Sequence, residues 1–151
     1  TNVDTEKLFA PWDCTKWLVV SSCFFMIPAV YAYQHELYWY AMLFMCISVA
    51  SANHWRRATY SLRRNIDLFF ARTSFVVFFF TGLHTLKNKT RLIIGFSGVV
   101  LILCCFYMSN KLYQANNPNW YKFHFMFHFF VMCEQMLVLY NMTQVVSQCD
   151  P

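Results

Sequence analysis

The sequence predicts an all-α protein, a polytopic transmembrane helical bundle of five spans that forms a single domain over residues 1–151. Hydrophobic residues make up 58% of the chain and charged residues only 13%, whereas a soluble domain carries about 25% charge. The apolar residues also fall into five long runs, each close to the roughly 20 residues that a helix needs to cross a bilayer. Helices are expected because lipid offers no hydrogen-bond partner to an unpaired backbone.

The five predicted spans follow one another with short connections. The first, Trp17–Tyr33, contains Pro28, which should kink the helix because proline lacks a backbone donor and clashes with the preceding turn. The others are Leu37–Asn53, Ile66–Leu86, Leu92–Met108 and Trp120–Tyr140. Because the connections are short, consecutive helices should be antiparallel neighbours in one bundle.

The positions of lysine and arginine predict the orientation of the bundle. One side holds most of the basic residues, namely Lys7, Lys16, Arg56, Arg57, Arg63, Arg64, Lys111 and Lys122. The opposite side holds Lys87, Lys89 and Arg91. The positive-inside rule places the N-terminus and the Arg-rich loop on the cytosolic or matrix side of an endomembrane or of the mitochondrial inner membrane. Basic clusters confined to the ends of apolar runs also argue against a nucleic-acid partner.

Ionisable side chains inside or beside three of the spans are predicted to meet near the inner end of the bundle. His54 ends the second span, and Asp67 begins the third. His124 and His128 lie about 6 and 12 Å along the last span at 1.5 Å per residue. An imidazole or carboxylate in hydrocarbon needs a partner or a polar cavity, so these groups should face the bundle interior.

The spacing of the histidines is compatible with a metal site. His124 and His128 are four residues apart on one helical face, with Cβ atoms about 5–6 Å apart, and His54 supplies a third ligand. A three-histidine site with an open fourth position is a catalytic arrangement of zinc. Asp67 would orient an imidazole or act as general base. The competing interpretation is that these are buried histidines bonded to backbone or hydroxyl groups without a metal.

Two further ionisable residues lie toward the opposite side of the bundle. Glu134 is about 21 Å along the last span, and His84 near the end of the third span has a similar depth. We expect these side chains to form an interhelical pair with a structural role.

The arrangement of these motifs resembles the CREST superfamily of membrane hydrolases, which includes the alkaline ceramidases and the progestin and adipoQ receptors. In that family a histidine ends the second helix, an aspartate begins the third, and the last helix carries HxxxH. Here these places are held by His54, Asp67 and His124-Phe125-Met126-Phe127-His128. The resemblance implies a zinc ion held by the three histidines and hydrolysis of a lipid amide.

The chain departs from the family pattern in two respects. The family commonly has seven helices, and five are predicted here. The family's serine, four residues before the histidine of the second helix, falls on Ala50 in this sequence. Ser51 is therefore the neighbouring residue assigned to the catalytic role of that serine, together with Asp67.

Two functions from different classes follow. The first is an integral membrane zinc-dependent hydrolase that acts on the amide or ester of a lipid at the inner end of the bundle. The second is a non-catalytic accessory subunit of a large membrane complex, such as a respiratory complex or an ATP synthase, with a degenerate CREST-like fold. Short loops and a coat of 17 phenylalanines and 9 tyrosines suit a protein that packs among lipids and other subunits.

Overall fold

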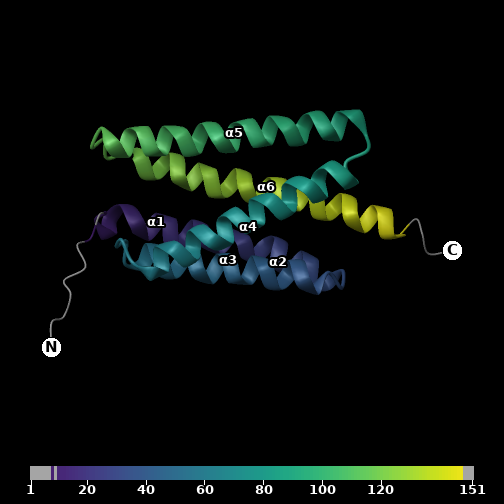
Figure 1. Cartoon of the computed structure of the whole chain (residues 1–151), viewed down its shortest axis with the longest axis horizontal. Coiled ribbons are helices and arrows are strands. Elements are labelled where there is room, and N and C mark those ends of the chain that lie inside the picture. Colours follow the sequence, from purple (N-terminus) through teal and green to yellow (C-terminus); the bar gives the residue numbers. More distant parts are fainter. Residues whose placement is uncertain (1–7, 9, 148–151) are drawn as a thin grey trace.

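The computed structural model describes residue 8 and residues 10–147 of the chain, so Lys7 lies outside the described residues. The helices are α1 (Trp12–Ser22), α2 (Met26–Gln34), α3 (Tyr38–Arg56), α4 (Leu62–Thr85), α5 (Lys89–Gln114) and α6 (Trp120–Ser147) (Figure 1). Since α1 and α2 form one interrupted helix, the predicted all-α bundle of five helices is confirmed.

The interruption in the first helix is a 3₁₀ turn over Cys23–Phe25. Pro28 lies just beyond this turn, in the first part of α2. A proline ring clashes with the carbonyl four residues earlier, which here belongs to Phe24, and cannot donate a hydrogen bond to it. The helix is thus interrupted one turn before Pro28, and the kink itself stays a prediction.

Four of the helices are long and apolar enough to cross a membrane: Trp12–Gln34, Leu62–Thr85, Lys89–Gln114 and Trp120–Val145. The remaining helix, α3, has 19 residues and carries Ser48, Ser51, Asn53 and His54 in its second half. These polar residues lower its hydropathy, and three of the four are buried within the bundle. That α3 crosses the membrane therefore stays a prediction.

The connections alternate between the two ends of the bundle (Figure 1). The α3–α4 and α5–α6 connections lie at the same end as the start of α1, which we call the basic end because Arg56, Arg57 and Lys111 are there. The α2–α3 and α4–α5 connections lie at the opposite end, called the distal end. This alternation is the one expected for antiparallel neighbours joined by short loops.

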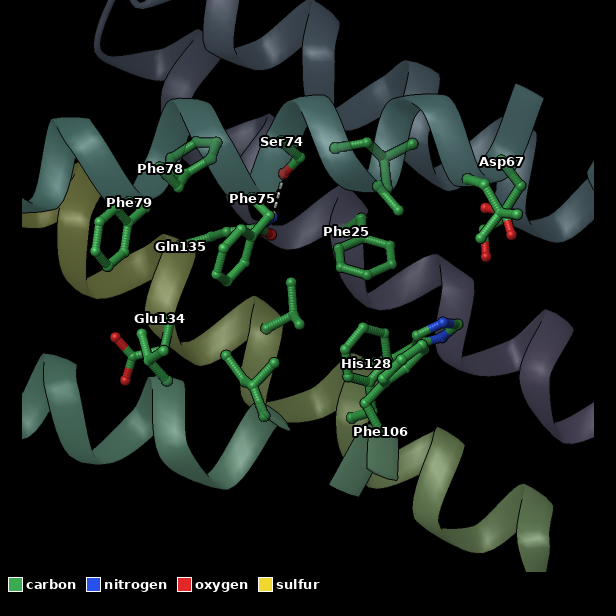
Figure 2. A pocket seen from close by; sticks show the side chains of 18 of the residues that line it. Phe25, Asp67, Ser74, Phe75, Phe78, Phe79, Phe106, His128, Glu134 and Gln135 are labelled. Atoms are coloured by element: carbon green, nitrogen blue, oxygen red, sulfur yellow. Dashed lines mark hydrogen bonds between the residues drawn. The ribbon is translucent and has the colours of Figure 1, made fainter. Parts of the chain in front are cut away.

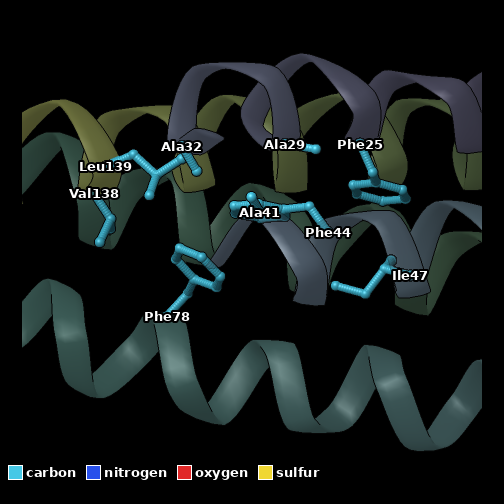
Figure 3. Packing of buried hydrophobic residues seen from close by; sticks show 9 residues of the cluster. All are labelled: Phe25, Ala29, Ala32, Ala41, Phe44, Ile47, Phe78, Val138 and Leu139. Atoms are coloured by element: carbon cyan, nitrogen blue, oxygen red, sulfur yellow. The ribbon is translucent and has the colours of Figure 1, made fainter. Parts of the chain in front are cut away.

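Two buried clusters hold the helices together. The larger cluster (Figure 3) joins the first helix, α3, α4 and α6 through Phe25, Ala29, Ala32, Ala41, Phe44, Ile47, Phe78, Val138 and Leu139. Its small alanines allow α2 and α3 to approach closely, and the rings of Phe44 and Phe78 pack with centroids 4.9 Å apart. The smaller cluster lies at the basic end and consists of Ala10, Leu18, Trp55, Ala58 and Trp120. It fixes the end of α3 against the beginning of α6.

The packing around α4 and α5 leaves space inside the bundle. The α5 helix packs mainly against α6, whereas α4 packs against α3 and α6. The two helices are consecutive, but they diverge from their connection toward the basic end (Figure 1). A cavity lies between them, with α6 along one side.

Candidate functional site

The cavity between α4, α5 and α6 has a volume of about 160 Å³ and carries a few polar side chains in a mostly apolar lining (Figure 2). Toward the basic end it is lined by Ser51, Asp67, His124 and His128. Glu134 of α6 lines it toward the distal end, and Gln135 of α6 and Ser74 of α4 line it between Glu134 and the basic-end group (Figure 2). The rest of the wall is apolar and rich in aromatic rings, including Phe75, Phe78, Phe79, Phe106 and Phe127. Such a shape suits an elongated apolar ligand with polar groups.

Asp67 is held by serines from two other helices. Ser51 on α3 donates a hydrogen bond to the Asp67 carboxylate on α4. The Ser22 hydroxyl lies 3.0 Å from Ser51 Oγ, to which it can donate, and 2.7 Å from the carbonyl oxygen of Leu18. Ser48 Oγ donates to the carbonyl oxygen of Ser22 at 2.9 Å. Buried serines therefore pack where the first helix contacts α3, and Ser51 orients the Asp67 carboxylate.

His128 is fixed by a hydroxyl of the first helix. The Ser21 hydroxyl donates to the carbonyl oxygen of Leu18 at 3.0 Å and lies 2.7 Å from His128 Nδ1. A serine has one proton, so both contacts are hydrogen bonds only when His128 carries its proton on Nδ1 and donates it to Ser21. In that tautomer Nε2 keeps its lone pair, so His128 is a hydrogen-bond acceptor or a ligand at Nε2.

His124 lies in a row of rings at the basic end. Its imidazole centroid is 5.0 Å from that of His128 and 4.8 Å from the ring of Trp55. The ring of Trp55 is in turn 4.7 Å from His54. Trp55 therefore contacts both His54 and His124, while His54 is outside the set of described residues that line the cavity.

The predicted ligands His54, His124 and His128 do not form a three-ligand metal centre in the described part of the chain. Among residue 8 and residues 10–147, no three histidine, cysteine, aspartate or glutamate side chains are grouped closely enough to hold one metal ion. Zinc requires ligand nitrogens about 2.0–2.1 Å from the metal. His124 and His128 lie side by side as the four-residue spacing predicts, but the third position is not filled. Zinc at this site stays a prediction from the sequence.

Most of the predicted site residues lie together at the basic end of the cavity. Ser51 and Asp67 are hydrogen-bonded, and His124 and His128 line the same cavity. The sequence analysis missed Ser21 and Ser22, although a pair of hydroxyls inside the apolar run from Trp17 to Tyr33 was a usable signal.

The expected pairing of Glu134 with His84 is wrong. The carboxylate of Glu134 lies against Gly98 of α5, and His84 is exposed on α4. Within the described part of the chain, the only salt bridge joins Lys16 to Asp13. Equal depth in the bundle did not bring the two side chains together, because Glu134 points toward α5 whereas His84 is exposed on the outside of α4.

The fold and the cavity define a class: a candidate integral membrane protein of the helical type, with an internal cavity that is polar at both ends. Comparison with protein-family models, with curated proteins and with solved structures finds no match to the chain. The resemblance to the CREST superfamily accordingly rests on the motifs around His54, Asp67 and the His124–His128 pair.

Proposed function

We propose that the protein is an integral membrane hydrolase that cleaves the amide or ester linkage of a lipid held in the bundle cavity. The observation that supports this most strongly is the hydrogen-bonded pair of Asp67 and Ser51, which lines the same end of the aromatic-walled cavity as His128. A lipid chain can lie along that wall while its polar linkage reaches the carboxylate.

The chemistry begins with a water molecule between Asp67 and His128. The carboxylate and the Nε2 lone pair are both acceptors, so such a water directs its two protons to them and its own lone pair to the lipid carbonyl. Asp67 takes one proton as the water attacks, and the same proton is passed to the leaving alcohol or amine. Ser51 keeps the carboxylate oriented through its hydrogen bond.

Zinc belongs to this proposal only as the prediction that the CREST resemblance implies. His54, His124 and His128 would hold the ion. A bound zinc ion would acidify the attacking water. Metal analysis of the purified protein and of a His128→Ala variant tests the prediction. Stoichiometric zinc that is lost in the variant supports it, and wild-type protein without zinc contradicts it.

The test of the hydrolase is turnover by purified protein in lipid nanodiscs. A panel of ester-linked and amide-linked lipids is supplied, and released fatty acid is measured by mass spectrometry. We expect release from at least one lipid class, with a loss of about a hundredfold or more in Asp67→Asn because the general base is removed. The matched control is Ser97→Ala, since Ser97 is exposed on α5 and bonds only its own helix at Ile93. Absence of release from every lipid class contradicts the proposal.

One observation favours a second function, that of a non-catalytic accessory subunit. Large apolar side chains are exposed along the helices, among them Trp39, Phe69 and Phe80, which suits packing among lipids and other subunits. A subunit should migrate in native gels, after mild-detergent extraction, with a complex far heavier than its own 18.0 kDa. Migration as a monomer or small homo-oligomer contradicts this second function.

A further inference from the structure

The distal part of the cavity contains a carboxyl group that the proposed reaction does not use. Glu134 lines the cavity from α6, and its carboxylate occupies the space above Gly98 of α5 (Figure 2). A Cβ at position 98 would overlap this carboxylate, so a larger residue there would require the Glu134 side chain to move. Within the described part of the chain, Glu134 makes no hydrogen bond and no ion pair.

A second acceptor without a partner lies beside it in the sequence. Gln135 is only 3% exposed and lines the same cavity. Its Nε2 donates to Ser74 Oγ on α4 at 3.0 Å, but its Oε1 is buried and has no hydrogen-bond partner. Exchanging the amide oxygen and nitrogen would leave the nitrogen without a partner instead. A buried polar atom that lacks a partner is unfavourable, so a ligand that supplies one gains affinity.

Several other polar side chains in the distal half of the bundle are hydrogen-bonded within the protein. Asn141 accepts a hydrogen bond from Arg91 of α5 and donates to the carbonyl oxygen of Leu137. Tyr40 bonds Thr81 at 3.3 Å, and Tyr31 bonds Thr143 at 3.1 Å. Glu134 and Gln135 differ from these groups in facing the cavity. Polar groups of a transmembrane bundle that face a cavity mark ligand or ion sites more often than packing contacts.

We propose that Glu134 and Gln135 form a second polar subsite, which binds a hydrogen-bond-donating group, an ammonium or a hydroxyl, of an amphiphile whose alkyl chain lies along the aromatic wall. The inference rests on the part of the proposed function in which the cavity holds a lipid chain. It adds the substrate class: an aliphatic amine or alcohol whose donor lies far from the cleaved linkage. Along α4 the stretch from Asp67 to Phe79 is about 18 Å at 1.5 Å per residue, which suits one extended alkyl chain.

The experiment measures binding without turnover. Hexadecylamine, hexadecanol and methyl palmitate are titrated separately against the purified protein, and apparent Kd values are taken from native mass spectrometry. Wild-type protein should bind the amine and the alcohol about tenfold or more tightly than the ester, which has a chain of similar length but no donor. Glu134→Leu should remove this preference, and Glu134→Gln should reduce it more for the amine than for the alcohol.

The controls separate this subsite from the fold and from the proposed reaction. Glu36→Gln changes an exposed acid in the α2–α3 connection and should leave the preference unchanged. Thermal unfolding should show Glu134→Leu folded, because removing an unpartnered carboxyl from the bundle interior does not destabilise it. Asp67→Asn should keep the preference while losing turnover, so the subsite stands even if hydrolysis is not found. Equal binding of the three probes, a preference that survives in Glu134→Leu, or no probe binding overturns the inference.

Discussion

The two polar ends of the cavity differ in how their side chains are satisfied. At the basic end Asp67 is bonded to Ser51, and His128 to Ser21, so each functional group is oriented by a buried hydroxyl. At the distal end Glu134 has a space made for it by Gly98 but makes no hydrogen bond among the described residues. Both groups of side chains line the same cavity (Figure 2).

This difference separates a group oriented for chemistry from a group left open for a ligand. A catalytic carboxylate needs a fixed direction, which hydrogen bonds from neighbouring helices provide. A recognition group needs free acceptor capacity, which it has only when the protein leaves it without a partner. The contrast therefore favours reaction at the basic end and recognition at the distal end.

The largest effect expected is an all-or-none difference in labelling between the two ends of the bundle. Single cysteines replace Tyr60 in the α3–α4 connection, Asn116 in the α5–α6 connection and Lys87 in the α4–α5 connection, all of which are exposed. An impermeant thiol reagent added to oriented vesicles should label the first two from one face and the third from the other, above the wild-type background. Labelling of Tyr60→Cys and Asn116→Cys from opposite faces would show that the helices do not cross as proposed.

Blocking the middle of the cavity should separate its two ends. Ala71 of α4 lines the cavity between Asp67 and Phe75, and tryptophan at this position would fill the space. We expect lipid turnover to fall by about a hundredfold or more, because the linkage can no longer be positioned at Asp67. The matched variant is Val76→Trp on the same helix, where the side chain is 52% exposed. Similar turnover in both variants would mean that the substrate does not occupy the cavity.

Removing one hydrogen bond at the basic end should have a smaller effect. Ser51→Ala leaves Asp67 without its donor, and kcat should fall about tenfold, since a hydrogen bond to a charged group contributes about 1.5–3 kcal/mol. Ser48→Ala is the matched control on α3, because Ser48 is also buried but bonds only the carbonyl of Ser22. We expect its kcat to change by less than about threefold. Equal losses in the two variants would assign Ser51 a packing role.

The smallest effect concerns the turns at the two ends of the bundle. Glu36 in the α2–α3 turn has φ 60°, and Asn116 in the α5–α6 turn has φ 52°. Asparagine tolerates this left-handed conformation, whereas glutamate is strained in it. Glu36→Gly should raise the free energy of unfolding by about 1 kcal/mol, and Asn116→Gly should change it by less than about 0.5 kcal/mol. Unfolding in mixed micelles measures both, and a larger gain at position 116 would contradict the assignment of strain.

Helix rise and residue spacing allowed much of the basic end to be predicted from the sequence. The depth of Asp67 follows from the predicted spans and the charge rule, and the shared face of His124 and His128 follows from helix geometry. Depth does not fix the direction in which a side chain points, because direction depends on how each helix is rotated against its neighbours. For that reason His84 and Glu134 share a depth without meeting, and Trp55 contacts both His54 and His124. The roles of Ser21 and Ser22 depend on the 3₁₀ turn that follows them, whose position Pro28 sets.

The central claim, hydrolysis at the basic end, is tested most directly by the source of the oxygen in the product. Purified protein in nanodiscs is incubated in heavy-oxygen water with the lipid class that it cleaves, and the released fatty acid is weighed by mass spectrometry. Attack by a water held at Asp67 and His128 predicts one heavy oxygen atom in each new carboxylate, with release reduced about a hundredfold or more in Asp67→Asn. Fatty acid without the heavy atom, or equal release by the variant, contradicts the account.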